Sequence, residues 1–161
     1  MKIDLIAVGR LGRTVENGLC ADYLSRAAAA GKALGFGGVD LVEVEPRIKP
    51  GARGTGMARE AEAILAKVPA GAVLVACDER GQAMTSRAFA GRVEKWRDGG
   101  APRLCLVIGG ADGLDQSIRD RAQLLIGFGA WTWPHALARV MAAEQIYRAV
   151  TILGGSPYHR D

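Results

Sequence analysis

The sequence lacks the features of membrane, zinc-binding and disulfide-rich proteins. No apolar stretch approaches the roughly 18–20 residues that a transmembrane helix needs. Cys20, Cys77 and Cys105 lie far apart without CxxC spacing, which argues against a metal site and a disulfide framework. The opening MKIDLIAVGR has a lysine and an aspartate beside its apolar residues, so it predicts a first strand and no signal peptide. We therefore expect a cytoplasmic protein with reduced cysteines, no metal and no membrane partner.

Length and composition indicate one globular domain over residues 1–161. Domains cluster near ~100–150 residues, which is close to the length of this chain. Hydrophobic residues make up 49% of the chain and charged residues 24%. This balance supports a buried core and excludes disorder as the main state.

The charge is mildly basic, with a formal net charge of +4. Such an excess permits a nucleic-acid partner without demanding one. Arg47, Lys49, Arg53 and Arg59 fall in one Gly/Pro-rich stretch, and residues 46–56 of it predict a mobile loop. This loop could contact a nucleic-acid backbone.

Strand-like and helix-like segments alternate along the chain. Short apolar runs predict strands over residues 3–8, 39–44, 72–77 and 103–108. Helical periodicity predicts helices over residues 14–30, 58–68, 86–97, 117–126 and 135–153. This alternation predicts an α/β fold with a mostly parallel sheet and helices on both faces.

Local signals refine two of these helices. Thr14 and Ser86 are the predicted N-caps, since a hydroxyl can accept a hydrogen bond from a free backbone N–H group. In the helix over residues 14–30, we expect Leu19, Tyr23 and Leu24 to share one buried face.

Three segments follow predicted strands or open the last helix, where parallel sheets bind their ligands. The first is CDERG, residues 77–81, whose Asp78 could hold a ligand, pair with Arg80 or cap a turn. The second is GGADG, residues 109–113, which fits neither the dinucleotide fingerprint nor the P-loop. Asp112 would also repel a phosphate. A backbone that approaches a ligand and a plain tight turn are both open there.

The third segment, WTWPHALAR, covers residues 131–139. Pro134 suits the first turn of a helix, and the helix N-terminus favours a neutral His135. Trp131 and Trp133 either pack in the core or form an apolar slot of the size of adenine. A simple cap is the other interpretation of Pro134 and His135.

The C-terminal tail, SPYHRD, places Tyr158, His159 and Arg160 in a row. These side chains could stack on a base, move a proton and hold a phosphate. A frayed polar end is equally compatible with this composition.

Several motifs together carry a family resemblance. They are IDLIAVGRL, CDERG, TSRAFAGRVEKW, LVIGGADGL, TWPHALAR, EQIYRA and the terminal PYHR, which span nearly the whole chain. In this combination the sequence resembles the ribosomal large subunit methyltransferase H family. The resemblance implies a SPOUT-class α/β fold whose C-terminal segment forms a deep trefoil knot. It also implies a homodimer that transfers a methyl group from S-adenosylmethionine to N3 of a pseudouridine, in a 23S rRNA stem-loop of the assembled 70S ribosome.

The resemblance also assigns a cofactor site. Its cofactor-binding residues would be Cys77, Gly110, Gly129, Ala130, Trp131, Thr132, Trp133 and Pro134. Backbone groups of residues 129–134 would wrap the adenine and methionine parts of the cofactor. Cys77 stands where relatives usually have leucine, and Trp131 or Trp133 would shape the adenine pocket.

The chemistry implied by the resemblance needs residues that manage a proton. N3 of pseudouridine must lose its proton before it attacks the electrophilic sulfonium methyl, which itself needs no metal. His159 is the first candidate for the base or proton relay, and Tyr158 could stack on or hydrogen-bond the base. Arg148 and Arg160 could neutralise the imide charge or hold phosphate, and His135 is a weaker candidate.

Two other functions are open at this point. A non-catalytic knotted dimer that holds RNA or the ribosome would not bind S-adenosylmethionine. A nucleotide-binding regulator would bind NAD or ATP, but the phosphate-binding motifs are missing. Saturable binding of S-adenosylmethionine separates both alternatives from the methyltransferase.

Overall fold

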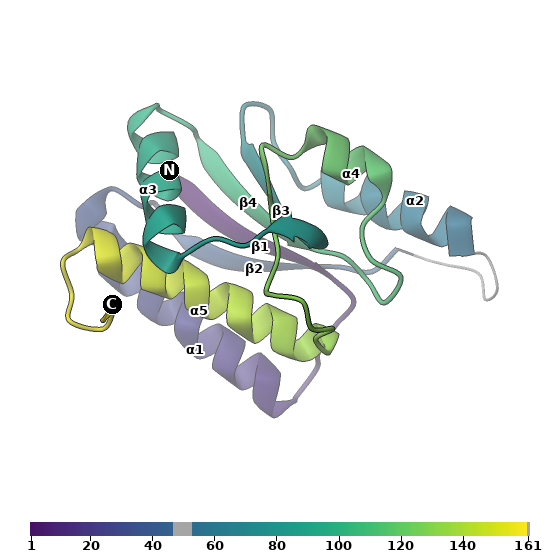
Figure 1. Cartoon of the computed structure of the whole chain (residues 1–161), viewed down its shortest axis with the longest axis horizontal. Helices are drawn as coiled ribbons and strands as arrows, with labels where there is room; N and C mark the ends of the chain where they lie inside the picture. Colours follow the sequence, from purple (N-terminus) through teal and green to yellow (C-terminus); the bar gives the residue numbers. More distant parts are fainter. Residues whose placement is uncertain (47–52, 161) are drawn as a thin grey trace.

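The computed structural model describes residues 1–46 and 53–160 and has an α/β architecture (Figure 1). Its elements are β1 (Lys2–Val8), α1 (Val15–Gly31), the short 3-10 helix η1 (Lys32–Leu34), β2 (Val39–Val44), α2 (Arg53–Leu65), β3 (Val73–Gln82), α3 (Ser86–Asp98), β4 (Arg103–Ile108), α4 (Gln116–Arg121), β5 (Leu124–Ile126) and α5 (His135–Leu153). Of the expected loop over residues 46–56, residues 47–52, with Arg47 and Lys49, lie outside the described residues. Residues 53–56 form the first turn of α2, so the loop prediction is wrong there.

The five strands form one parallel sheet in the order β2-β1-β4-β3-β5. The central strands β1 and β4 are buried almost throughout, and such runs are typical of a sheet that is covered on both sides. The α/β class and the parallel sheet predicted from the sequence are therefore confirmed. The trefoil knot implied by the resemblance stays a prediction.

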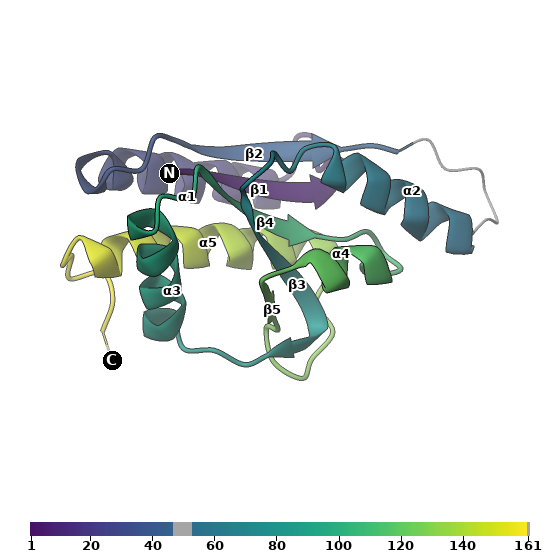
Figure 2. The ribbon, with the colours of Figure 1, turned by 90° about the horizontal axis from the view of Figure 1, so that it is seen from above.

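Helices cover both faces of the sheet (Figure 2). Alternate residues of β1 point to opposite faces, as the period of a strand requires. Leu5 joins a core cluster with residues of α1, α3 and α5. Ile6 joins a second cluster with residues of α2 and α4. The predicted coverage of both faces is confirmed.

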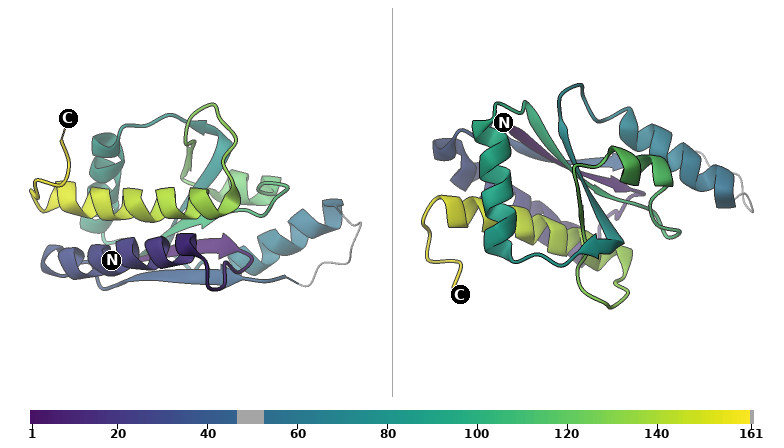
Figure 3. Two further views of the ribbon diagram at one scale, coloured as in Figure 1. Left: turned by 90° about the horizontal axis from the view of Figure 1, so that it is seen from below. Right: turned by 45° about the horizontal axis from the view of Figure 1, so that its top comes forward.

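Helices α1 and α5 lie side by side, and both begin at the same end of the molecule (Figure 3).

Within the described residues, no helix combines the length and apolar character that a bilayer-spanning segment requires. Cys20 and Cys105 are buried, Cys77 is partly buried, and all three are free thiols.

The predicted helix over residues 117–126 is wrong in its second half. Helix α4 ends at Arg121, and Ala122 has extended backbone angles of φ −71° and ψ 132°. Leu124, Leu125 and Ile126 then pair with β3 as the edge strand β5. A short apolar run fits a helix or a strand equally well by periodicity, and here the hydrogen bonds to β3 decide.

The predicted strand over residues 72–77 is too short, and the expected CDERG loop belongs to it. Strand β3 continues to Gln82, which pairs with Ile126 after a register shift that begins at Cys77. Residues 78–81 thus form an irregular, bulged stretch that redirects the strand. Gly81 is required there, because a Cβ atom would lie 2.6 Å from the backbone nitrogen of Gly127.

Details of three helices also differ from the sequence predictions. Thr14 caps α1 as expected, by accepting a hydrogen bond from the backbone N–H of Asn17. The N-cap of α3 is Thr85 instead of Ser86. Leu19 is 46% exposed, because the buried face of α1 runs through Cys20 and Leu24. The predicted helix 58–68 is α2, which begins and ends earlier.

Candidate active site

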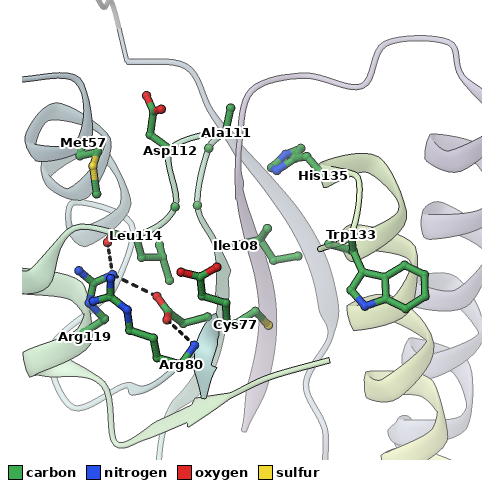
Figure 4. Close-up of a pocket in the computed structure, with 16 residues that line it drawn as sticks. Met57, Cys77, Arg80, Ile108, Ala111, Asp112, Leu114, Arg119, Trp133 and His135 are labelled. Atoms are coloured by element: carbon green, nitrogen blue, oxygen red, sulfur yellow. Dashed lines mark hydrogen bonds and ion pairs between the residues drawn. The ribbon is translucent and has the colours of Figure 1, made fainter. Parts of the chain in front are cut away.

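A cavity of about 430 Å³ opens at the carboxyl ends of β3 and β4 (Figure 4). Its walls come from the end of β3, the turn after β4, and the start of α5. A second cavity of about 220 Å³ adjoins it, shares Cys77, Ile108 and Trp133, and continues along residues 128–132. The first volume lies in the ~300–1,000 Å³ range of small-molecule sites. The sheet therefore forms its hollow where the strand-end rule predicts a ligand.

Seven of the eight predicted cofactor-binding residues line these cavities. Cys77 and Trp133 line both, and Gly110 lines the larger one. The smaller cavity adds Gly129, Ala130, Trp131 and Thr132. Pro134 lines neither cavity and stands as the N-cap position of α5. The structure thus gathers segments that are more than thirty residues apart in the sequence into one site.

Asp78 is held in place by Arg119 on α4. The carboxylate Oδ2 lies 3.1 Å from a terminal nitrogen of Arg119, and both side chains are largely buried. Oδ1 accepts a hydrogen bond from the backbone N–H of Arg80 at 2.9 Å. The turn interpretation of Asp78 is confirmed, whereas its ion-pair partner is Arg119 and not Arg80. Arg119 also donates to the carbonyl oxygen of Leu114, which ties α4 to the turn after β4.

The turn over residues 109–113 is closed by its glycines. Gly110 and Gly113 form an isolated bridge, and a Cβ atom at Gly109 would lie 2.6 Å from the carbonyl oxygen of Gly113. The backbone N–H of Gly110 donates to Glu60 on α2 at 3.3 Å. Burial, followed by the nearby charge of Asp112, raises the pKa of Glu60. The predicted tight turn is confirmed, and the same turn lines the cavity.

The tryptophans line the site without filling the core. Trp131 is 79% exposed and Trp133 is 37% exposed, so core packing is wrong for Trp131. Their ring centroids are 6.1 Å apart in a tilted arrangement. The indole N–H of Trp133 donates to the carbonyl oxygen of Phe128 at 3.1 Å and fixes that ring. An aromatic surface of this kind can receive a flat heterocycle.

The thiol of Cys77 is protonated at neutral pH. Desolvation, followed by the charge of Asp78, raises its pKa to about 12. A thiol in this state is a small apolar surface and not a nucleophile. Its position at the end of β3 therefore contributes shape to the cavity.

His135 lines the larger cavity from the start of α5. Burial lowers its pKa, and the charge of Arg139 lowers it further. The neutral imidazole expected from the sequence is confirmed, but burial is the main cause. His135 Nε2 accepts a hydrogen bond from Nε of Arg139 at 2.9 Å.

The predicted catalytic residues form a second cluster at the end of α5. Tyr158 donates its hydroxyl hydrogen to Glu144 at 3.0 Å, and Nε of Arg148 donates to the same carboxylate at 2.8 Å. A terminal guanidinium nitrogen of Arg148 lies 3.3 Å from Nδ1 of His159. Arg160 is exposed at the end of the described chain. The structure brings Tyr158, His159 and Arg148 together.

Tyr158 is a hydrogen-bond donor in this cluster. Desolvation and the hydrogen bond to Glu144 raise its pKa. Its ring meets that of Tyr147 edge-on, with centroids 4.7 Å apart, and the guanidinium of Arg148 lies 4.8 Å from its centroid. The tail is therefore docked on α5 and not frayed.

Within one chain, the cofactor-site residues lie near the start of α5, and the tail cluster lies near the end of that helix. His135 stands at the first position of α5 and Arg148 in its second half. At the ~1.5 Å rise of an α-helix, these residues are about 20 Å apart. The structure does not bring the two predicted sets together within a single chain.

Several functional residues escaped the sequence predictions. Glu144 stands four residues before Arg148, a helical spacing that favours an ion pair and could have revealed it. Arg139 stands four residues after His135 in the same way. Arg119 gave no signal, because its partner Asp78 comes from another element. Within residues 1–46 and 53–160, no group of three or more potential ligand side chains is arranged to hold a metal ion.

Comparison with known proteins places these features in a family. A family model described as predicted SPOUT methyltransferase matches residues 1–159. The chain is 57% identical to a ribosomal RNA large subunit methyltransferase H of Caulobacter sp. (strain K31), over 161 residues that cover 100% of both chains. It is 51% identical to the Ruegeria pomeroyi (strain ATCC 700808 / DSM 15171 / DSS-3) protein of that name, covering 99% of both. Its fold is similar to that of a probable methyltransferase from Bordetella pertussis Tohama I, with a TM-score of 0.51, 21% identity and coverage of 92% and 95%.

Proposed function

Because the chain belongs to the ribosomal RNA large subunit methyltransferase H family of SPOUT methyltransferases, we propose that it methylates N3 of a pseudouridine in a 23S rRNA stem-loop. The methyl donor in this proposal is S-adenosylmethionine, and the substrate is the assembled ribosome in the cytoplasm. The observation that carries the proposal is the hollow at the ends of β3 and β4, where three separate segments meet.

The residues of this hollow fit S-adenosylmethionine. The tilted pair Trp131 and Trp133 offers an apolar surface for adenine. The turn over residues 109–113 and the segment over residues 129–134 present backbone groups that can hydrogen-bond the ribose and the methionine part. The carboxylate of Glu79 lines the hollow and can complement a ligand with a sulfonium and an ammonium group, whereas Asp78 is paired with Arg119. When bound, this cofactor supplies an electrophilic methyl group.

The tail cluster is suited to receive the base. N3 must lose a proton, and the negative charge then spreads over the neighbouring carbonyl oxygens. Arg148 is oriented by Glu144 and can stabilise this charge. His159, beside Arg148, is the candidate that moves the proton. Tyr158 can donate a hydrogen bond to the base or stack on it, and Arg160 can hold phosphate.

A homodimer would bring the two clusters together. In a twofold dimer whose α5 helices run antiparallel, the tail of one copy lies near the start of the partner's α5. Exposed apolar side chains mark a surface for this contact, with Val15 77% and Leu19 46% exposed on α1 and Leu137 40% exposed on α5. These helices begin at the same end of the molecule (Figure 3). We therefore infer that each site combines one copy's cofactor pocket with the other's tail.

The function is tested on 23S rRNA from a strain that lacks the gene. We expect one pseudouridine to lose its methyl group and to regain it on complementation, as measured by primer extension or mass mapping. Complementation with a Gly129→Val variant should fail, because a β-branched residue is strained at the φ of +95° found there. An unchanged methylation pattern in the deletion strain contradicts the proposal.

The shared site is tested by mixing two inactive variants. Gly129→Val damages the cofactor pocket and His159→Ala damages the tail. If each site uses both chains, random mixing should restore about a quarter of the wild-type activity, because half the dimers regain one of two sites. Mixed dimers that stay inactive would place the whole site within one chain.

A non-catalytic dimer that holds RNA or the ribosome is the alternative. The exposed Trp131 at the mouth of the smaller cavity favours it, because a solvent-exposed indole can also stack on an RNA base. Calorimetry with S-adenosylmethionine decides between the two functions. Saturable binding supports the methyltransferase, and its absence supports the binding protein.

A further inference from the structure

Arg139 is an arginine with no exposed surface. Its relative exposure is 0%, and it lies in the second turn of α5. A guanidinium remains charged at all physiological pH values, so complete burial is tolerated only when it is paired and hydrogen-bonded. Arg139 meets this requirement with contacts to several elements.

Three of these hydrogen bonds join α5 to the ends of β1 and β2. One terminal nitrogen of Arg139 donates to the carbonyl oxygens of Val8 at 2.5 Å and Gly9 at 2.7 Å. The other donates to Glu43 on β2 at 2.8 Å. Glu43 also accepts a hydrogen bond from the backbone N–H of Leu11 at 3.1 Å. Arg139 thus fixes the start of α5 against the sheet.

A further contact fixes the state of His135. Nε of Arg139 donates to Nε2 of His135 at 2.9 Å. Because arginine has no acceptor, Nε2 must carry the lone pair, and the proton of the neutral ring is on Nδ1. Backbone groups of Val8 and Gly109 also face His135, and they raise its pKa less than burial lowers it. Gly109 begins the turn that lines the cavity, so His135 bridges Arg139 and that turn.

We propose that Arg139 is a positioning residue for the cofactor pocket, because it holds His135 as the Nδ1–H tautomer between the start of α5 and the Gly109 turn. Both segments line the larger cavity (Figure 4). The proposal rests on the proposed function, since the ligand of this cavity is taken to be S-adenosylmethionine. Arg139 itself does not line the cavity.

Protonation of His135 should disrupt this arrangement. A proton on Nε2 removes the acceptor of the Arg139 hydrogen bond and places two cations in contact. The charged groups on the elements around His135 are Arg139 on α5, Glu43 on β2, Glu60 on α2, Asp78, Glu79 and Arg80 on β3, Asp112 in the turn after β4, and Arg119 on α4. Burial and the charge of Arg139 lower the pKa of His135 from 6.5. Affinity for S-adenosylmethionine should therefore decline as the pH falls below 6.5.

The first test reads the tautomer of His135 directly. The chain has only 2 histidines, so nitrogen-15 NMR of the histidine rings gives two sets of signals. A His159→Ala variant assigns them. We expect His135 to carry its proton on Nδ1 at pH 7.5, and a proton on Nε2 overturns the proposal. This measurement needs no cofactor and no activity.

The second test measures the affinity for S-adenosylmethionine by calorimetry between pH 7.5 and pH 5.5. Arg139→Lys keeps the charge but cannot make all the contacts, and it should bind about tenfold more weakly at pH 7.5. His135→Gln offers an amide oxygen to Arg139 and does not titrate. It should bind more weakly than the wild type, because His135 lines the cavity, and its affinity should no longer depend on pH in this range.

Arg103→Lys is the matched control, because Arg103 also pairs with a buried carboxylate, Asp4, at 2.5 Å, but on the far end of β4. It should keep the wild-type pH profile. An Arg139→Lys variant that binds like the wild type, or a His135→Gln variant that keeps the pH dependence, overturns the proposal. If Arg139→Lys does not fold, the wild-type and His135→Gln profiles still decide. A wild-type chain that binds no S-adenosylmethionine contradicts the proposed function instead, and the tautomer still tests Arg139.

Discussion

Tyr158 and Glu144 share a hydrogen bond of 3.0 Å that folds the C-terminal tail back on α5. The same carboxylate oxygen accepts hydrogen bonds from Arg148. Glu144 therefore accepts hydrogen bonds from both the tail and the second half of α5. Its substitution separates the placement of the tail from the chemistry of the tail residues themselves.

We expect Glu144→Gln to loosen the tail while the fold is retained. The amide is neutral, so the charge-assisted hydrogen bonds from Arg148 and the contact with Tyr158 weaken, at a cost of about 1–2 kcal/mol in unfolding free energy. Hydrogen exchange of the amides in residues 155–160 should accelerate severalfold. Glu94→Gln on α3 is the control, since Glu94 forms a more exposed helical pair with Arg97. Unchanged protection of the tail in Glu144→Gln contradicts this view of Glu144.

Asp78→Asn should destabilise the protein and the cofactor site together. It leaves the guanidinium of Arg119 largely buried without its ion-pair partner, which costs about 3 kcal/mol in typical proteins. Urea denaturation measures the loss. Asp98→Asn removes an exposed partner of Arg97 and should cost less than about 1 kcal/mol. Equal losses for the two variants would show that the buried Asp78–Arg119 pair contributes no more to the unfolding free energy than an exposed pair.

Gly81→Ala should be among the most harmful single-methyl changes in the chain. The new Cβ atom would collide with backbone atoms of Ile126 and Gly127, which cannot move as a flexible side chain could. We expect a loss of about 2–3 kcal/mol in unfolding free energy and impaired binding of S-adenosylmethionine.

Gly91→Ala is its matched control, because Gly91 lies inside α3 and a Cβ atom there meets nothing within 4 Å. Alanine favours a helix more than glycine does, so Gly91→Ala should stabilise the protein by up to about 1 kcal/mol. Thermal unfolding of both variants checks the pair. A tolerated Gly81→Ala would mean that the β3–β5 contact is looser than the structure indicates.

The unfolding free energy should depend on pH through His135. Its pKa is lowered in the folded state from 6.5, so the unfolded chain binds its proton more readily. Stability from this group is complete above pH 6.5 and declines as the pH falls below that value. Urea denaturation at pH 7.5, 6.5 and 5.5 measures the decline, and His135→Gln should reduce it. A decline that is the same in His135→Gln would assign it to other groups.

The sequence predicted the elements whose signals are local. Thr14 and the apolar runs of β1 and β4 define their elements without help from the rest of the chain. The strand-end rule also selected the segments that line the cavities. These predictions succeeded because capping and the burial of a whole strand leave a direct pattern in the sequence.

The failures have a common cause in contacts between distant segments. Residues 124–126 form strand β5 because they pair with β3, and Asp78 pairs with Arg119 because α4 packs against the end of β3. Leu19 is apolar and was expected in the core, yet Cys20 is the residue that faces α5. The thiol of Cys20 donates a hydrogen bond to the carbonyl oxygen of Arg139, with a sulfur–oxygen distance of 4.0 Å. Such choices depend on the packed structure and not on any one segment.

Helix α5 also acts as a ruler between the cofactor cavity and the tail. Its N-terminus carries His135, and its second half carries Glu144 and Arg148. Inserting a single residue between them would rotate the tail by about 100° around the helix axis. Inserting seven would nearly restore its direction but move it about 10 Å further away. The length of this helix and the rotation between its two ends are therefore constrained separately. Insertions of one and of seven residues should accordingly have different effects on the position of the tail.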